Sequence, residues 1–137
     1  MKIQLLEINK EKFTKSFQLF ENIILKNPKF DSNIDYTSEE LEIFDALTSR
    51  FVRIYETSIQ LFKTFDSLQS LNVAESFGDL IANCNKLNLI TNEDLWFDMR
   101  LIRNKISHDY LPNQMQEMIN LIIDDFYQEF KNLNTKI

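Results

Sequence analysis

Apolar side chains recur at steps of three and four residues along most of the chain, the spacing that places them on one face of an α-helix. The helix of the first stripe is predicted to end near Asn27, because Pro28 disfavours helical geometry in the residue before it. Residues 28–36 are polar and are interpreted as a connection. The residues of this first stripe are Phe13, Phe17, Phe20 and Ile24.

The longest stripe predicts a helix over residues 38–66, about 40 Å long at a rise of 1.5 Å per residue. Thr37-Ser38-Glu39-Glu40 has the form of a capping box, in which a hydroxyl and a carboxylate satisfy exposed backbone N–H groups. Ser58 is the one break in a stripe that otherwise comprises Leu41, Phe44, Leu47, Phe51, Ile54, Phe62 and Phe65. A helix of this length is typical of the spine of a bundle.

Two helix starts follow. Asn72-Val73-Ala74-Glu75 has the form of a second capping box and is predicted to open a helix that runs to about Lys86. Thr91-Asn92-Glu93-Asp94 is predicted to open the next helix, which should stop near Tyr110 because Leu111 precedes Pro112. Its inward residues are Leu95, Met99, Ile102 and Ile106.

The last helix is predicted to begin at residues 113–116, with a stripe of Met115, Ile119, Ile122, Phe126, Phe130 and Leu133. Four or five helices with short connections predict an all-α, up-and-down antiparallel bundle. The single glycine and two prolines leave no room for the many tight turns of an all-β fold. A chain of 137 residues suits one core, so residues 1–137 are expected to form a single domain.

Composition narrows the functional classes. The net charge of −6 and pI near 4.8 argue against a protein that coats nucleic acid by charge alone, but not against a local basic groove. Cys84, the only cysteine, cannot form an internal disulfide, which fits a reducing compartment. The N-terminus lacks the apolar region of a signal peptide, and no apolar run approaches the roughly 18 residues of a membrane span. The chain is expected to be cytoplasmic, without a membrane partner.

Candidate chemistry is concentrated in the segment Arg103-Asn104-Lys105-Ile106-Ser107-His108-Asp109-Tyr110, which holds the only histidine. On a continuous helix, Asn104 and His108 would lie one above the other because they are four residues apart. Arg103 would lie about 140° round the helix from His108, although its long side chain could reach the same opening. His108 would occupy the last turn, where free carbonyl groups favour a protonated imidazole.

Histidine beside arginine is the pair that metal-free RNA cleavage needs. The ribose 2′-hydroxyl loses a proton as it attacks the adjacent phosphate, the leaving 5′-oxygen gains one, and histidine exchanges protons near neutral pH. Arginine can hold the phosphate by paired hydrogen bonds and stabilise the charge that builds on its oxygens. One histidine per chain supplies one proton carrier, so a symmetric dimer would supply both. No cofactor and no metal site are predicted, since the acidic residues Asp124, Asp125 and Glu129 have no partner histidine.

The spacing Arg103-x4-His108-x-Tyr110 resembles the R-x4-H-x-Y motif of HEPN-fold ribonuclease toxins, which are encoded beside a minimal nucleotidyltransferase antitoxin. Residues from about 10 to 133 also resemble a related branch, the nucleotidyltransferase substrate-binding proteins, in Trp96 and in Arg50-Phe51-Val52-Arg53-x-Tyr55-Glu56. The resemblance implies a homodimeric bundle in which two motifs line a cleft and cut RNA without metal. It implies that Arg103 and His108 are catalytic, with Asn104 as a polar helper. It further implies that the nucleotidyltransferase attaches AMP to Tyr110 and so silences the nuclease.

Three functions stay open at this point. The first is an endoribonuclease toxin that acts as a homodimer on RNA and is silenced by its nucleotidyltransferase partner. The second is a non-catalytic partner that presents substrate to that nucleotidyltransferase, which the negative net charge favours. The third is a plain helical interaction module in which the motif is coincidence.

Other side chains have structural interpretations beside the functional ones. Arg50 and Arg53 are candidates for RNA binding, but pairs of this kind are more often solvated or paired with acids. Tyr110 could simply pack its ring over a helix end. Trp96 and the phenylalanines are expected in the core, and Cys84 is expected as a small buried residue.

Overall fold

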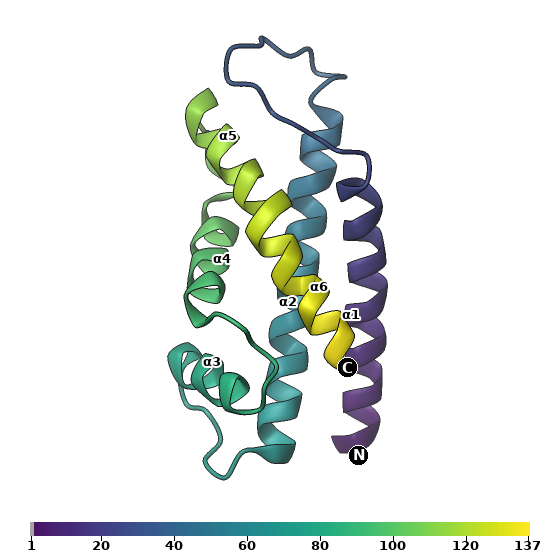
Figure 1. Ribbon diagram of the computed structural model, residues 1–137, viewed down its shortest axis with the longest axis vertical. Coiled ribbons are helices and arrows are strands. Elements are labelled where there is room, and N and C mark those ends of the chain that lie inside the picture. Colours follow the sequence, from purple (N-terminus) through teal and green to yellow (C-terminus); the bar gives the residue numbers. More distant parts are fainter. Residues whose placement is uncertain (1) are drawn as a thin grey trace.

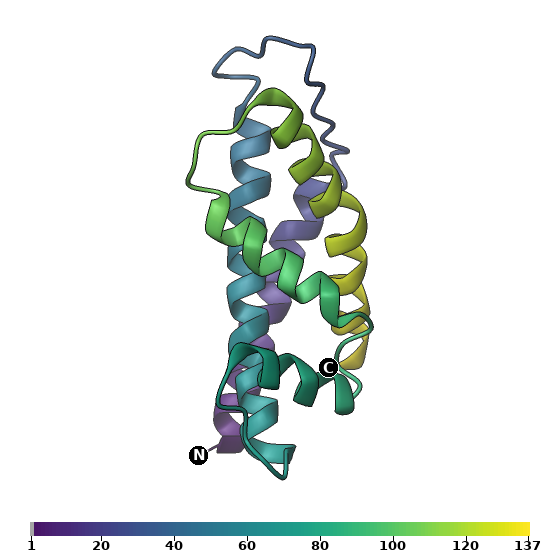
Figure 2. The same ribbon diagram turned by 90° about the vertical axis from the view of Figure 1, so that its left-hand side faces the viewer.

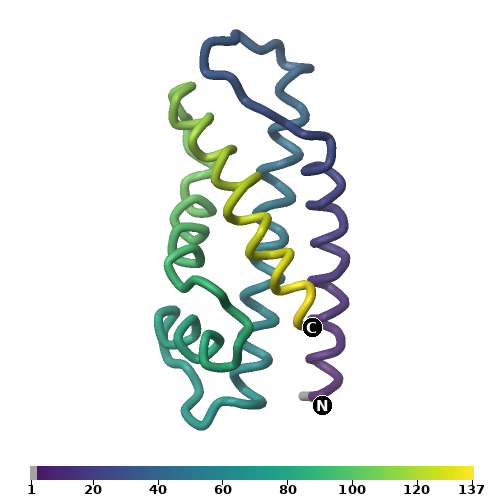
Figure 3. Tube along the Cα trace, in the orientation of Figure 1, coloured from purple at the N-terminus to yellow at the C-terminus, as the bar shows by residue number. Residues whose placement is uncertain are grey.

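The computed structural model describes residues 2–137, and every regular element in that range is a helix. Two long antiparallel helices lie side by side, α1 (Lys2–Ile24) and α2 (Glu42–Gln69) (Figures 1 and 3). The shorter α4 (Glu93–Lys105) lies across α2, and α3 (Phe77–Lys86) lies next to the N-terminal end of α4 (Figure 2). A continuous C-terminal helix returns along the bundle and consists of α5 (Pro112–Leu121), the π-helical turn η1 (Ile122–Phe126) and α6 (Tyr127–Lys136). The predicted all-α bundle of four to five helices is confirmed.

The first two helices follow their predicted stripes. All four residues of the first stripe are buried, and α1 ends at Ile24, three residues before the expected end. Asn27 then adopts a φ of 55°, the left-handed geometry that commonly follows a helix. Ahead of α2, the backbone N–H of Glu40 donates to Thr37 Oγ1 at 3.2 Å, and that of Thr37 donates to Glu40 Oε1 at 3.1 Å. The hydrogen bonds of this capping box are confirmed, but they order a turn ahead of the helix. Because α2 spans Glu42–Gln69, the predicted range 38–66 is wrong by about four residues at its start and about three at its end.

The predicted start of α3 is wrong by about four residues. The helix begins at Phe77, where Ser76 Oγ accepts a hydrogen bond from the backbone N–H of Asp79 at 3.1 Å. Segment 72–75 stays outside the helix because long-range contacts hold it there. Asp66 Oδ2 accepts the backbone N–H of Ala74 at 2.9 Å, and the Asn83 side chain donates to the Asn72 carbonyl at 2.9 Å.

The core is built on aromatic side chains. Trp96 of α4 is fully buried, with its ring 4.7 Å from that of Phe62 on α2 and 5.6 Å from that of Phe130 on α6. Edge-to-face rings at such distances stabilise a core beyond the area that they bury. Cys84 is also fully buried, and burial raises the pKa of its thiol to about 12. The core predictions for Trp96 and Cys84 are therefore confirmed.

One buried carboxylate ties the C-terminal helix to the start of α4. Glu129 is 2% exposed, and its Oε2 accepts the Trp96 indole N–H at 2.7 Å and the Thr91 backbone N–H at 3.1 Å. Its Oε1 accepts the Thr91 hydroxyl. Glu129 therefore fixes where α4 begins, while Asp124 and Asp125 of the same helix are exposed.

Replacing Glu129→Ala is expected to lower the free energy of unfolding by about 3 kcal/mol, because it leaves the buried indole N–H of Trp96 without an acceptor and removes both hydrogen bonds to Thr91. Urea denaturation followed by far-UV circular dichroism measures the loss. The matched control Asp125→Ala removes an exposed carboxylate from the same helix and should stay within about 0.5 kcal/mol of wild type. Equal stability of the two variants would contradict the structural role of Glu129.

Candidate functional site

The motif Arg103-x4-His108-x-Tyr110 spans the end of α4 and the connection 106–111. The predicted end near Tyr110 is wrong, because α4 stops at Lys105 and the backbone N–H of His108 donates to the Lys105 carbonyl at 2.9 Å in a turn. Leu111 is extended (φ −67°, ψ 151°), as a residue before proline prefers, and the preceding residues form the turn that redirects the chain into α5. Asn104 and His108 are therefore not stacked on one helix face, and His108 lies beyond the last helical turn.

His108 and Tyr110 line a pocket of about 550 Å³ between α4 and α5. The His108 side chain is exposed and borders solvent at this pocket. The remaining lining residues come from both helices and their connection, and they are Ile102, Lys105, Asp109, Gln114, Glu117, Met118 and Leu121. An exposed imidazole at an open pocket can exchange protons with a bound substrate.

Tyr110 presents only part of its side chain to this pocket. Its ring packs against the core, and its hydroxyl is buried without a hydrogen-bond partner among residues 2–137. Burial raises the pKa of Tyr110, so the phenol stays protonated at neutral pH. A buried hydroxyl without a partner is a destabilising feature.

Arg103 is directed toward α2 rather than into the pocket of His108. Its Nη2 lies 2.6 Å from Glu56 Oε1, with 41% of the arginine side chain and 47% of the glutamate side chain exposed. Its Nη1 lies 3.5 Å from Asn104 Oδ1, at the outer limit of a hydrogen bond. Within one chain the structure thus groups Arg103, Asn104 and Glu56, and it groups His108 with Tyr110 in the neighbouring pocket.

Glu56 is the site residue that the sequence did not single out. It lies 47 residues before Arg103, and only the fold brings the two together. The signal available in the sequence was its place at the end of the Arg50–Glu56 segment, on the exposed side of the long helix.

The two candidate RNA-binding arginines of α2 differ in their surroundings. Arg50 donates from Nη1 to the Leu19 carbonyl of α1 at 2.8 Å, so its guanidinium connects α2 to α1. Arg53 is exposed one turn before Glu56 and is therefore the one of the two that lies near the Arg103 side of the site.

Comparisons with known proteins agree with this fold. The family model described as "Nucleotidyltransferase substrate binding protein like" matches residues 9–137, and the chain belongs to that family. Among solved structures, the chain is similar to one in the crystal structure of a mutant of the toxin-antitoxin pair MntA-HpeT. The two are 17% identical, the match covers 96% of this chain and 98% of that chain, and the TM-score is 0.66. A search of curated proteins found no match. None of the helices between residues 2 and 137 has the length and hydropathy of a membrane span.

Glu56→Gln is expected to change the free energy of unfolding by no more than about 1 kcal/mol, because half-exposed ion pairs contribute little in water. Urea denaturation measures this, with Glu39→Gln as a control for the loss of an exposed carboxylate elsewhere. A loss above about 2 kcal/mol would instead mean that the Arg103–Glu56 pair holds α4 against α2.

Proposed function

We propose that this chain is the ribonuclease toxin of a cytoplasmic toxin–antitoxin pair whose antitoxin is a minimal nucleotidyltransferase. The observation that carries the proposal is the exposed His108 imidazole at an open pocket, five residues beyond the half-exposed Arg103. Membership of the nucleotidyltransferase-partner family supports it, as does the likeness of fold to a chain of the MntA-HpeT toxin-antitoxin pair.

The proposed reaction breaks an RNA phosphodiester without metal. The 2′-oxygen gives its proton to one histidine and bonds to phosphorus, while the P–O5′ bond breaks and the 5′-oxygen takes a proton from a second histidine. The products are a 2′,3′-cyclic phosphate and a 5′-hydroxyl, so atoms and charge balance. Arg103 stabilises the charge on the non-bridging oxygens through N–H donors that Glu56 does not use. Asn104 is a neutral polar partner beside that guanidinium.

A homodimer supplies what one chain lacks. Each chain has a single histidine, and the proposed reaction needs both a base and an acid. Each chain also separates Arg103, on the α2 side of α4, from the pocket of His108. Two chains related by a twofold axis through the ends of α4 would place both sets of groups around one strand of RNA.

Silencing is proposed to act on Tyr110, to which the nucleotidyltransferase transfers AMP. The Tyr110 hydroxyl is buried, so the connection 106–111 must open to present it. A nucleotide cannot be buried where the hydroxyl lay, and the modified side chain would therefore remain outside, beside His108. A bulky anion at that place would exclude the phosphate of RNA by sterics and by like charge.

His108→Ala and Arg103→Ala are each expected to reduce cleavage of single-stranded RNA at least about 100-fold, since each removes a proton carrier or a transition-state contact. Purified protein, labelled RNA and a chelator in the buffer measure the rate. Unfolding free energies near that of wild type would show that the loss is chemical, because both side chains are exposed. In cells, wild type should stop growth and fragment RNA, whereas both variants should be harmless.

Mixed dimers test the need for two histidines. When wild type is produced together with an excess of His108→Ala chain, activity should fall with the square of the wild-type fraction. A linear fall would show that one histidine suffices. A wild type that leaves RNA whole and cells unharmed in the absence of a partner would exclude the nuclease and leave the non-catalytic substrate-binding role.

Production together with the partner nucleotidyltransferase should add the mass of one AMP group to the wild-type chain and none to Tyr110→Phe. Intact-protein mass spectrometry measures this, and the unmodified Tyr110→Phe chain should stay toxic beside an active partner. A modification that persists in Tyr110→Phe would place the acceptor elsewhere.

A further inference from the structure

A second pocket, of about 440 Å³, lies between α2, α3, α4 and the loop before α3. Two cations border it, Lys63 of α2 and Arg100 of α4. Apolar side chains form part of its wall, mainly Ile59, Phe77 and Leu80. Its size falls within the roughly 300–1,000 Å³ of ligand pockets in proteins.

Both cations are available to a ligand. Neither Lys63 nor Arg100 forms an ion pair among residues 2–137, whereas Arg103 is paired with Glu56. The Arg100 guanidinium lies 4.6 Å from the centre of the Phe77 ring, which orients it. An oriented guanidinium loses less entropy when it binds a phosphate.

Two acids, Asp66 and Glu75, also border the pocket. Asp66 accepts hydrogen bonds from the Ala74 backbone N–H at 2.9 Å and from the Asn83 side chain at 2.8 Å. Burial alone would raise the pKa of Asp66, but hydrogen bonds from Ser70, Ala74 and Asn83 outweigh it and lower the pKa. Its oxygens thereby bind the loop before α3, through Ala74, and α3 itself, through Asn83. Glu75 is exposed and lies in that loop.

Arg100, which borders the second pocket, lies one helical turn from Arg103 on α4. Arg100 and Arg103 are three residues apart on α4, so they are neighbours on the helix surface, about 5–6 Å apart between Cβ atoms. Both guanidinium groups act on one buried side chain, Tyr55 of α2. Burial raises the pKa of Tyr55 to about 12, against the opposing charges of Arg100 and Arg103. The two arginines therefore lie on neighbouring turns of α4, and Arg100 is the one that lines the second pocket.

We propose that Lys63 and Arg100 form a second phosphate subsite, which binds the single-stranded RNA next to the phosphate that Arg103 contacts. The proposal rests on the proposed ribonuclease function and adds two strand-positioning residues to it. A strand that runs along α4 could place successive phosphates at Arg103 and Arg100, which are one turn apart, and the apolar wall beside Arg100 suits the face of a base. The subsite would give this acidic protein two unpaired cations with which to hold RNA.

The test measures RNA binding without cleavage. All variants carry His108→Ala, and a fluorescent single-stranded RNA reports the dissociation constant by anisotropy over a range of salt. Lys63→Gln with Arg100→Gln is expected to weaken binding at least about tenfold at low salt and to reduce the salt slope by about 1.4, or 0.7 per lost phosphate contact. In the chain with His108 intact, the double variant should raise KM while kcat stays near that of wild type.

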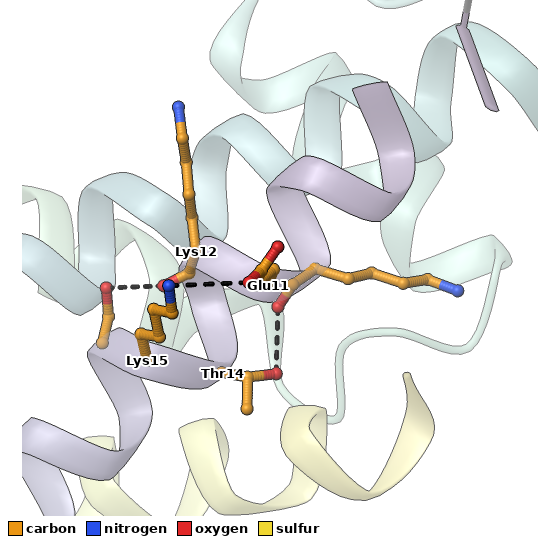
Figure 4. A network of polar contacts seen from close by, with 6 residues as sticks. Glu11, Lys12, Thr14 and Lys15 are labelled. Carbon is orange, nitrogen blue, oxygen red and sulfur yellow. Dashed lines mark hydrogen bonds and ion pairs between the residues drawn. The ribbon is translucent and has the colours of Figure 1, made fainter. Parts of the chain in front are cut away.

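Lys12→Gln is the matched control. Lys12 is exposed on α1 and extends away from the Glu11–Lys15 ion pair and the Thr14 hydrogen bond of its neighbours (Figure 4). It forms no ion pair within the part of the chain that the structure describes, so its replacement removes one positive charge outside the pocket and is expected to change the salt slope little. Lys63→Arg with Arg100→Lys retains both charges and should keep the salt slope.

Each outcome decides the proposal. It is overturned if the double variant binds RNA as well as Lys12→Gln does, or if the His108→Ala chain does not bind RNA at all. If wild type cleaves RNA and the double variant binds RNA as well as Lys12→Gln does, the ribonuclease proposal stands and the subsite is excluded. If wild type cleaves nothing but RNA binding depends on Lys63 and Arg100, the subsite stands and the ribonuclease proposal is excluded.

Discussion

The position of α4 depends on one buried carboxylate. Glu129 accepts hydrogen bonds from Thr91, just ahead of α4, and from Trp96, on its first turns, and so anchors this helix to the C-terminal one. The arginines of the proposed chemistry depend on that anchor, because Arg100, Arg103 and Asn104 project from the same helix. A polar group buried this deeply stabilises the fold only when all its partners are in place, which makes the start of α4 a specific position rather than one of several.

The two halves of the motif differ in rigidity. Arg103 is on a regular helix and is paired with Glu56, whereas His108 and Tyr110 belong to a connection without helical hydrogen bonds beyond its first turn. This division suits the proposed cycle, since phosphate binding needs a preset guanidinium, and modification of a buried hydroxyl needs a segment that can open. A loop can meet the second requirement at much lower cost in free energy than a helix.

The sequence predicted what depends on local periodicity. The stripes of α1, α2 and the C-terminal helix, the burial of Trp96 and the capping box at Thr37 all follow from spacing within one segment. The predictions were wrong or incomplete where groups from other segments determine the local structure. Segment 72–75 has the form of a capping box, yet Asp66 and Asn83 hold it outside the helix. The partners of Arg103 and Trp96 lie 47 and 33 residues away, and nothing in the local pattern names Glu56 or Glu129 for those contacts.

The π-helical turn Ile122–Phe126 gives the C-terminal helix two differently oriented halves. The apolar residues of this helix recur at steps of three and four, as in a regular α-helix, so their spacing does not predict the π-helical turn. A π-turn holds one residue more than an α-turn, which is how a single inserted residue is absorbed without breaking a helix. Ahead of it, Met118 and Leu121 face the His108 pocket, and beyond it, Glu129 and Phe130 face the core at Trp96. The segment before the π-helical turn thus forms the wall of the His108 pocket, and the segment after it holds the core anchor. Substitutions in the pocket wall can therefore leave the core anchor in place.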